Sequence, residues 1–421
     1  MGTKGKKVLI LGNGFDLAHG LPTRYSDFLE FCSRLEVIFT YRVDGKYEDI
    51  YKVNFLDGWK ISDSIKDMLY VAFKERDIKK TFNDNGIKQT SIFAINKSVQ
   101  EIHDCLTKNI WYDYLNSLYK ENKMKGENWI DFESEVRYII HIVDQNATRL
   151  SQAFDEVAYK MDCDLLDDEK WDCFCNKLNN NWMKITGKTE NYRNSIKDFR
   201  EKSFTDLERL TRALELYLSC FVEKLDVDIR IKEITDINPD YIISFNYTNT
   251  YERLYKNKDV FHIHGRCIGD RVSEQNNMVL GIDEYWSEDE RDCHTNFTIF
   301  KKFAQRIRKK TGIDNYKYLN DINRIYASDG KHWTGNVDTS TTHTDGTTFV
   351  YIFGHSLDVT DKDILVDYLN NEATAVTVYC KDKGTEGELI ANVIQIIGEK
   401  RLLEKANQAP TKIEFKIQEC F

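Results

Sequence analysis

Two glycines separated by one residue follow the first apolar run of the sequence, in a pattern typical of a phosphate-binding turn. Val8-Leu9-Ile10-Leu11 leads into Gly12-Asn13-Gly14-Phe15-Asp16. Because glycine lacks a Cβ and tolerates positive φ, the backbone N–H groups of this turn could approach a pyrophosphate closely. All five residues of the turn are therefore candidate nucleotide-binding residues.

The dinucleotide fingerprint G-x-G-x-x-G is incomplete, since Leu17 stands where the third glycine belongs. This disfavours a hydride-transferring enzyme, and a tight turn without a ligand remains an alternative.

Polar residues also follow three other apolar runs. These segments are Phe245-Asn246-Tyr247, His262-Ile263-His264-Gly265 and Gly354-His355-Ser356, the last continued by Leu357-Asp358. In a parallel sheet, ligands bind beyond the carboxyl ends of the strands, so we expect these segments and the glycine turn to converge on one crevice.

Asn246 and His264 have the chemistry needed to cleave an N-glycosidic bond. Expelling the base of a nucleotide leaves an oxocarbenium-like ribose, so the site must orient a water molecule and bear developing charge. An amide can donate and accept at once, and a near-neutral histidine can accept a proton from that water or from a ribose hydroxyl. Alternatively, Asn246 could be the N-cap of a helix through Tyr251 and Leu254.

Other polar residues near these segments have simpler interpretations. His19 is either a loop residue or, beside the glycine turn, a ligand-binding one. Asp16 could instead shape the turn through an Asx bond. His262 and His264 alternate along one predicted strand and would face the same side, but no third ligand has metal-binding spacing, so no metal site is predicted.

The remaining carboxylates are expected at helix ends. Asp131 and Glu133 could be general acid–base carboxylates, but they are two residues apart, which points them away from each other on a helix, so Asp131 is instead predicted to cap it. Asp358, Asp361 and Asp363 most simply complement a helix N-terminus.

Hydrophobic patterning predicts an α/β fold, a doubly wound parallel sheet with a large helical insertion. Residues 1–40 and 236–421 are predicted to form a Rossmann-like nucleotide-binding domain, and residues 41–235 a mainly helical inserted subdomain. Predicted strands cover residues 8–11, 241–245, 260–264, 278–281, 348–353, 375–379 and 413–417, and predicted helices cover 25–38, 298–310, 361–369 and 386–397.

Composition restricts the partners. The 421 residues include 59 basic and 69 acidic ones, a formal charge of −10, which disfavours nucleic acid as a partner. No apolar stretch approaches the length of a signal peptide core or a membrane span, so we expect a cytoplasmic protein without membrane contact.

Five segments resemble the bacteriophage abortive-infection AbiH family. They are LGNGFDLAHGLPT (11–23), WIDFE (129–133), FNYT (245–248), HIHG (262–265) and FGHSLD (353–358). The resemblance implies a role as an antiphage effector. It leaves a phage-derived trigger and a homo-oligomer open as partners.

The AbiH-like segments in turn resemble sirtuin-type NAD-binding domains. This second resemblance implies that Asn246 and His264 match the sirtuin active-site asparagine and histidine, and that Gly354, His355, Ser356 and the following Asp358 line the adenosine side. Sirtuins have an aspartate where Thr248 stands, and zinc-binding cysteine pairs that this chain lacks, so protein deacylation is not expected.

The sequence therefore predicts an effector with NAD as its substrate or ligand, hydrolysing NAD or a related nucleotide at the N-glycosidic bond. The alternatives are a non-catalytic sensor of an ADP-ribose-containing ligand and a nuclease-type toxin.

Overall fold

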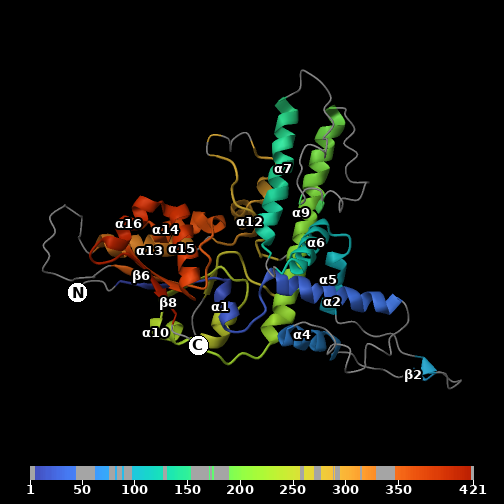
Figure 1. Cartoon of the computed structure of the whole chain (residues 1–421), viewed down its shortest axis with the longest axis horizontal. Helices are drawn as coiled ribbons and strands as arrows, with labels where there is room; N and C mark the ends of the chain where they lie inside the picture. The colour runs from blue at the N-terminus through green and yellow to red at the C-terminus, as the bar shows by residue number, and fades with distance from the viewer. Residues whose placement is uncertain are drawn as a thin grey trace.

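A six-stranded, all-parallel β-sheet organises one half of the molecule (Figure 1). The computed structural model describes residues 5–43, 62–74, 81–82, 88–89, 97–126, 130–152, 170, 173–174, 189–256, 260–269, 276–287, 289, 294–312, 315–328 and 347–418. The sheet strands are β1 (Lys7–Leu11), β4 (Tyr241–Ser244), β5 (Val260–His262), β6 (Thr348–Phe353), β7 (Thr374–Cys380) and β8 (Ile413–Ile417).

The strand order places β1 at the centre of the sheet. The order is β5-β4-β1-β6-β7-β8. Counted along the chain, these six strands are therefore arranged 3-2-1-4-5-6, the order of dinucleotide-binding sheets. Leu11 pairs with Ser244 on one side and with Phe353 on the other, so β1, β4 and β6 end level with one another. The point where the strand order reverses lies between β1 and β6.

Helices cover both faces of the sheet because the central strand is apolar on both (Figure 1). Val8 and Ile10 of β1 share a hydrophobic cluster with the helices on one face, and Leu9 and Leu11 share another with the helices on the opposite face. The first face carries α13 (Asn315–Ser328), α14 (Lys362–Leu369), α15 (Lys383–Ile397) and α16 (Glu399–Asn407); the second carries α1 (Asn13–Ala18), α10 (Lys232–Ile237) and α11 (Thr250–Tyr255).

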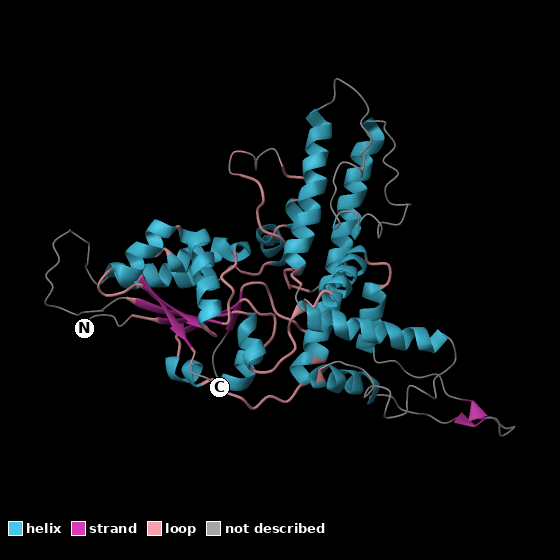
Figure 2. Cartoon of the chain, viewed as in Figure 1, coloured by secondary structure: helices cyan, strands magenta, loops and turns pink. Residues whose placement is uncertain are grey.

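A separate helical region follows β1 in the chain and has its own hydrophobic core. Its helices are α2 (Tyr25–Val43), α4 (Asp63–Lys74), α5 (Lys97–Leu106), α6 (Ile110–Met124), α7 (Phe132–Gln152) and α9 (Thr189–Cys220), with a small hairpin of β2 (Thr81–Phe82) and β3 (Lys88–Gln89). Figure 2 shows α7 and α9 extending away from the sheet as two long rods. Among the described residues, no helix has the length and apolar character to span a bilayer. The boundaries of the predicted domains stay a prediction.

The expected α/β class is confirmed, but the predicted strand at 278–281 is wrong. This segment is a buried loop whose Met278 and Leu280 pack into the helical core rather than onto the sheet. Its backbone groups form hydrogen bonds outside the sheet. The Val279 N–H donates to His264 O at 2.8 Å, and Gln305 Nε2 donates to Leu280 O at 3.0 Å. The predicted helix at 298–310 is a 3₁₀ turn (Thr298–Phe300) followed by α12 (Lys302–Lys309).

Candidate functional site

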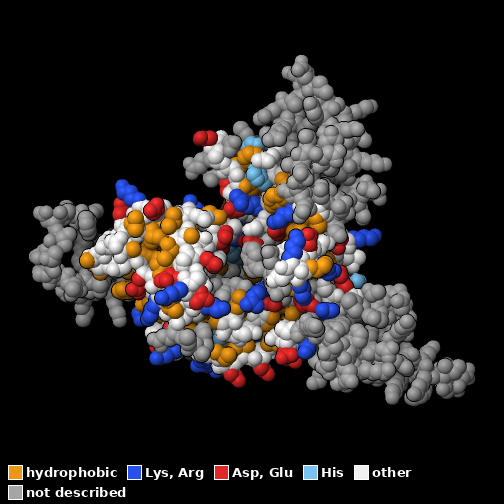
Figure 3. Space-filling view, viewed as in Figure 1, with side chains coloured by type: hydrophobic (Ala, Val, Ile, Leu, Met, Phe, Trp, Pro, Cys, Tyr) orange, Lys and Arg blue, Asp and Glu red, His pale blue; other side chains and the backbone are white. Residues whose placement is uncertain are grey.

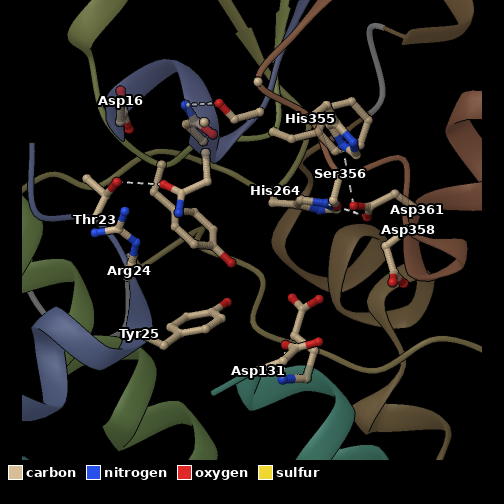
Figure 4. Close-up of a pocket in the computed structure, with 18 of the residues that line it drawn as sticks. Asp16, Thr23, Arg24, Tyr25, Asp131, His264, His355, Ser356, Asp358 and Asp361 are labelled. Carbon is tan, nitrogen blue, oxygen red and sulfur yellow. Dashed lines mark hydrogen bonds and ion pairs between the residues drawn. The ribbon is translucent and has the colours of Figure 1, made fainter. Parts of the chain in front are cut away.

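A cavity of about 500 Å³ opens beyond the carboxyl ends of β1, β4 and β6, where the strand order reverses (Figure 4). A volume of this size is typical of small-molecule sites. Ten of the twelve predicted site residues line it: Gly12, Asn13, Gly14, Asp16, Asn246, His264, Gly354, His355, Ser356 and Asp358. The other two, Phe15 and His19, lie outside its lining.

The glycine turn packs against the loop after β6, and this changes its expected role. The Gly12 N–H donates to Phe353 O at 3.1 Å and the Gly14 N–H donates to Gly354 O at 2.7 Å. Two of the three N–H groups expected to cradle a phosphate are therefore already bonded. Positive φ, considered for this turn, occurs instead at Gly354 (φ 67°), and Gly14 lies within helix α1. A Cβ on Gly14 would stand 2.7 Å from the Gly354 Cα, so close packing of the two loops requires glycine here.

Asn246 is buried directly after β4, and its side chain connects two loops of the site. Its Nδ2 donates to Gly12 O at 3.0 Å, which leaves Oδ1 as its acceptor. The N-cap position of α11 is occupied by Asn249, so the alternative role of Asn246 as a helix cap is wrong.

The two histidines of the HIHG segment have different surroundings, contrary to the expectation that they face the same side. β5 ends at His262, whose Nδ1 bonds the backbone oxygen of Asn246 at 2.8 Å and whose Nε2 lies 3.1 Å from Glu252. His264 lies beyond the strand end and lines the cavity, where its Nε2 bonds Asp361 at 2.9 Å. His262 thus supports the Asn246 backbone, whereas His264 faces the cavity.

A buried cluster of charged groups forms one end of the cavity. Lys302 Nζ lies 2.8 Å from Glu133 and 2.8 Å from Asp361. Asp361 also bonds His264, and its other oxygen lies 3.6 Å from His355 Nε2. Figure 4 shows His264, His355 and Asp361 gathered at this end, with Asp131 across the cavity. We call Glu133, Lys302, Asp361, His264 and His355 the lysine-centred cluster.

The environment separates the pKa values of the two carboxyls in the cluster. Burial raises the pKa of Glu133 to about 8, against the opposing charge of Lys302. Burial would raise the pKa of Asp361 too, but the charge of Lys302 and the bond from His264 hold it well below its usual value. One carboxyl is thus largely protonated at neutral pH and its neighbour is ionised, a combination typical of acid–base sites.

Both histidines of the cluster are neutral. Burial lowers the pKa of His264, and it lowers the pKa of His355 to about 4. Because the Nε2–H of His264 donates to Asp361, its lone pair lies on Nδ1, which is buried and has no hydrogen-bond partner in the described part of the chain. His264 therefore has the protonation state of a general base held by a carboxylate.

Asp16 and His19 have partners that the sequence did not indicate. Asp16 accepts from Thr248 Oγ1 at 2.6 Å rather than forming an Asx turn, and burial raises its pKa to about 6. His19 Nδ1 bonds Phe15 O at 2.7 Å and its Nε2 lies 3.0 Å from the Tyr255 hydroxyl. His19 therefore joins α1 to α11 outside the cavity.

Sequence reasoning missed the residues that the helices contribute. Asp131 caps α7 as predicted, since it accepts from Glu133 N–H at 3.0 Å, but Glu133 itself reaches Lys302 in the cavity wall. Tyr25 of α2, stacked on Phe132, also lines the cavity, as do Tyr247 and Asp361. The only local sign of Glu133 in the sequence is that an acidic residue stands two positions after the expected helix cap, Asp131. Among the described residues, no group of three or more His, Cys, Asp or Glu side chains is placed to hold a metal ion.

The strand order and the polar cavity at its reversal point define an α/β protein with a Rossmann-like sheet and a small-molecule-sized site. A family model described as "Bacteriophage abortive infection AbiH" matches residues 8–380, and the chain belongs to this family. Membership of this family implies a function in bacteriophage abortive infection. Comparisons with curated proteins and with solved structures gave no significant match.

Proposed function

We propose that the cavity binds NAD or a related nucleotide and hydrolyses its N-glycosidic bond, and that this reaction is the effector step of abortive infection. The observation that carries the proposal is the pairing of neutral His264 with ionised Asp361 in a cavity that Asn246 also lines. The cavity lies where nucleotides bind in sheets of this strand order.

The proposed reaction uses Asn246, His264 and Asp361, together with further carboxylates around the cavity. Asn246 Oδ1 accepts a hydrogen bond from a water molecule near the anomeric carbon, because Nδ2 is held by Gly12 O. His264 Nδ1 takes the proton of that water, and Asp361 stabilises the imidazolium that forms. Carboxylates around the cavity, among them Asp131 and Asp358, stabilise the positive charge that develops on the ribose.

A nuclease-type function has less support. Five carboxyl groups line the cavity, against two basic side chains, those of Lys302 and Arg24. The carboxyl groups belong to Asp16, Asp131, Glu133, Asp358 and Asp361. On the face shown in Figure 3, the basic side chains of the described residues are interspersed with acidic ones and form no continuous stripe for a nucleic acid backbone.

The test is base release by the purified full-length chain, incubated with NAD and with purine and pyrimidine mononucleotides and analysed by chromatography. We expect a free base and a ribose-containing product from at least one substrate, before or after phage infection of the producing cells. His264→Gln should lower turnover by about 10²–10⁴-fold with little change in affinity. His103→Gln, a histidine on α5 outside the cavity lining, is the control.

Recovery of every nucleotide intact under both conditions would contradict the hydrolytic proposal. A tight complex with unchanged ligand would instead identify a sensor of an ADP-ribose-containing molecule.

A further inference from the structure

The lysine-centred cluster contains one carboxylate more than its cation can neutralise. With both histidines neutral, ionised Glu133 and Asp361 against one Lys302 would give the cluster a net charge of −1. Their side chains are only 13% and 12% exposed, and Lys302 is 4% exposed. An uncompensated charge is costly at such burial, so one carboxyl takes up a proton.

Hydrogen-bond partners decide which carboxyl is protonated. Asp361 receives close bonds from His264 at 2.9 Å and Lys302 at 2.8 Å, and His355 lies 3.6 Å away, so its charge is well stabilised. Within the part of the chain that the structure describes, the only close partner of the Glu133 carboxyl is Lys302, at 2.8 Å. Glu133 is therefore the carboxyl that carries the proton, in agreement with the raised pKa of Glu133, about 8.

The protonated Glu133 bears on the identity of the substrate, because a cationic base and an uncharged base leave the ribose in different ways. Nicotinamide departs from NAD as a neutral molecule when the C–N bond electrons return to its cationic ring, so it needs no proton. An uncharged base such as a purine departs as an anion unless an acid protonates its ring as the bond breaks. A carboxylic acid beside the glycosidic bond is useful only in the second case.

Resting on the proposed N-glycosidic hydrolysis, we infer that Glu133 is the proton donor to the departing base and that the substrate is a nucleotide with an uncharged base, such as a purine nucleotide, rather than one with a cationic nicotinamide ring. The bond between the ribose carbon and the purine breaks, its electron pair goes to the purine, and Glu133 gives its proton to a ring nitrogen. Water adds its hydroxyl to the ribose carbon and its proton to His264. Proton exchange with solvent then restores protonated Glu133 and neutral His264.

Two mononucleotides that differ only in the base provide the test. AMP carries a purine and nicotinamide mononucleotide carries a leaving group that needs no proton. The full-length wild-type chain should release adenine from AMP, and the rate should fall as the pH rises through about 8, where Glu133 ionises. This pH profile requires no variant.

Variants then assign the proton donor. Glu133→Gln keeps the side-chain shape but has no acidic proton, so it should slow adenine release by about 10²–10⁴-fold. Any release of nicotinamide should change by less than about tenfold. Glu135→Gln removes a carboxylate from the same helix, outside the cavity lining, and should leave both rates unchanged.

Three outcomes would overturn the inference. Release of nicotinamide without adenine would show that the proposed hydrolysis is right and the assignment of an uncharged base is wrong. An adenine release rate that does not fall above pH 8 and survives Glu133→Gln would show that Glu133 is not the donor. Cleavage of neither mononucleotide, nor of any other nucleotide, would contradict the proposed function itself.

Discussion

The backbone N–H of Gly14 donates to the carbonyl oxygen of Gly354 at 2.7 Å, and this bond joins the loop after β1 to the loop after β6. A Cβ at position 14 would lie 2.7 Å from the Gly354 Cα and 2.8 Å from its carbonyl oxygen. Both are backbone atoms, which cannot turn aside as a side chain can. The two loops that form the site therefore depend on glycine for their packing.

Gly14→Ala should destabilise the protein by about 1–3 kcal/mol, although alanine normally favours a helix. Gly387→Ala is the matched control, because Gly387 also lies in a helix but nothing stands within 4 Å of its added Cβ. That variant should be as stable as the wild type or more so, by up to about 1 kcal/mol. Urea unfolding measures both, and a fully stable Gly14→Ala would show that the loops are not packed this closely.

Asp361→Asn should be destabilising, because it replaces the charged acceptor that His264 and Lys302 share with a neutral amide, although Glu133 can ionise and stay paired with Lys302. Hydrogen bonds to charged groups contribute about 1.5–3 kcal/mol, so we expect a loss of about 2–3 kcal/mol. Asp363→Asn, on the same helix, changes a carboxylate that is 48% exposed and keeps an oxygen acceptor for Arg306, so it should cost less than Asp361→Asn. Equal losses of unfolding free energy for the two variants would disprove the central place of Asp361.

Glu133 should make stability depend on pH in a direction that does not require activity. Its folded pKa, about 8, lies above the ordinary value of 4.5, so the folded state binds its proton more tightly than the unfolded state does. The stabilisation is complete below pH 4.5 and is lost as the pH rises through about 8. Between pH 5 and 8, the wild type should lose up to about 1.4 kcal/mol per pH unit relative to Glu133→Gln. Parallel stability curves for the two proteins would show that Glu133 is not protonated in the fold.

Asn246→Ala should abolish most turnover while leaving the fold nearly intact. The lost side chain donates one hydrogen bond, to Gly12 O at 3.0 Å, which is worth about 1 kcal/mol. Asn407→Ala removes a comparable bond, to Leu403 O at 2.9 Å on α16, and should cost similar stability without loss of turnover. Thermal unfolding and base release, measured on both variants, separate the two effects. A large drop in the melting temperature of Asn246→Ala alone would assign Asn246 a structural role.

The strand-end residues of the site could be predicted from the sequence because their positions follow from the fold class. Once β1, β4, β5 and β6 are parallel strands of one sheet, the residues that follow them must share one edge of the sheet. This rule predicted that Asn246, His264 and Gly354 would lie together, and all three line the cavity.

The helical residues of the site could not be predicted in the same way. Glu133 and Lys302 meet only because α7 and α12 pack at a particular distance and rotation beside the sheet. That arrangement depends on tertiary contacts, which hydrophobic periodicity does not specify. The same limit explains the error at Met278, whose apolar segment packs into the helical core instead of extending the sheet.

Hydrolysis in oxygen-18-labelled water identifies the broken bond and tests the central claim most directly. The purified chain is incubated with its nucleotide substrate in this water, and the masses of the products are measured by mass spectrometry. Attack of water on the anomeric carbon predicts one labelled oxygen on the ribose product and an unlabelled free base. Label on a phosphate, or a base still joined to its ribose, would contradict N-glycosidic hydrolysis.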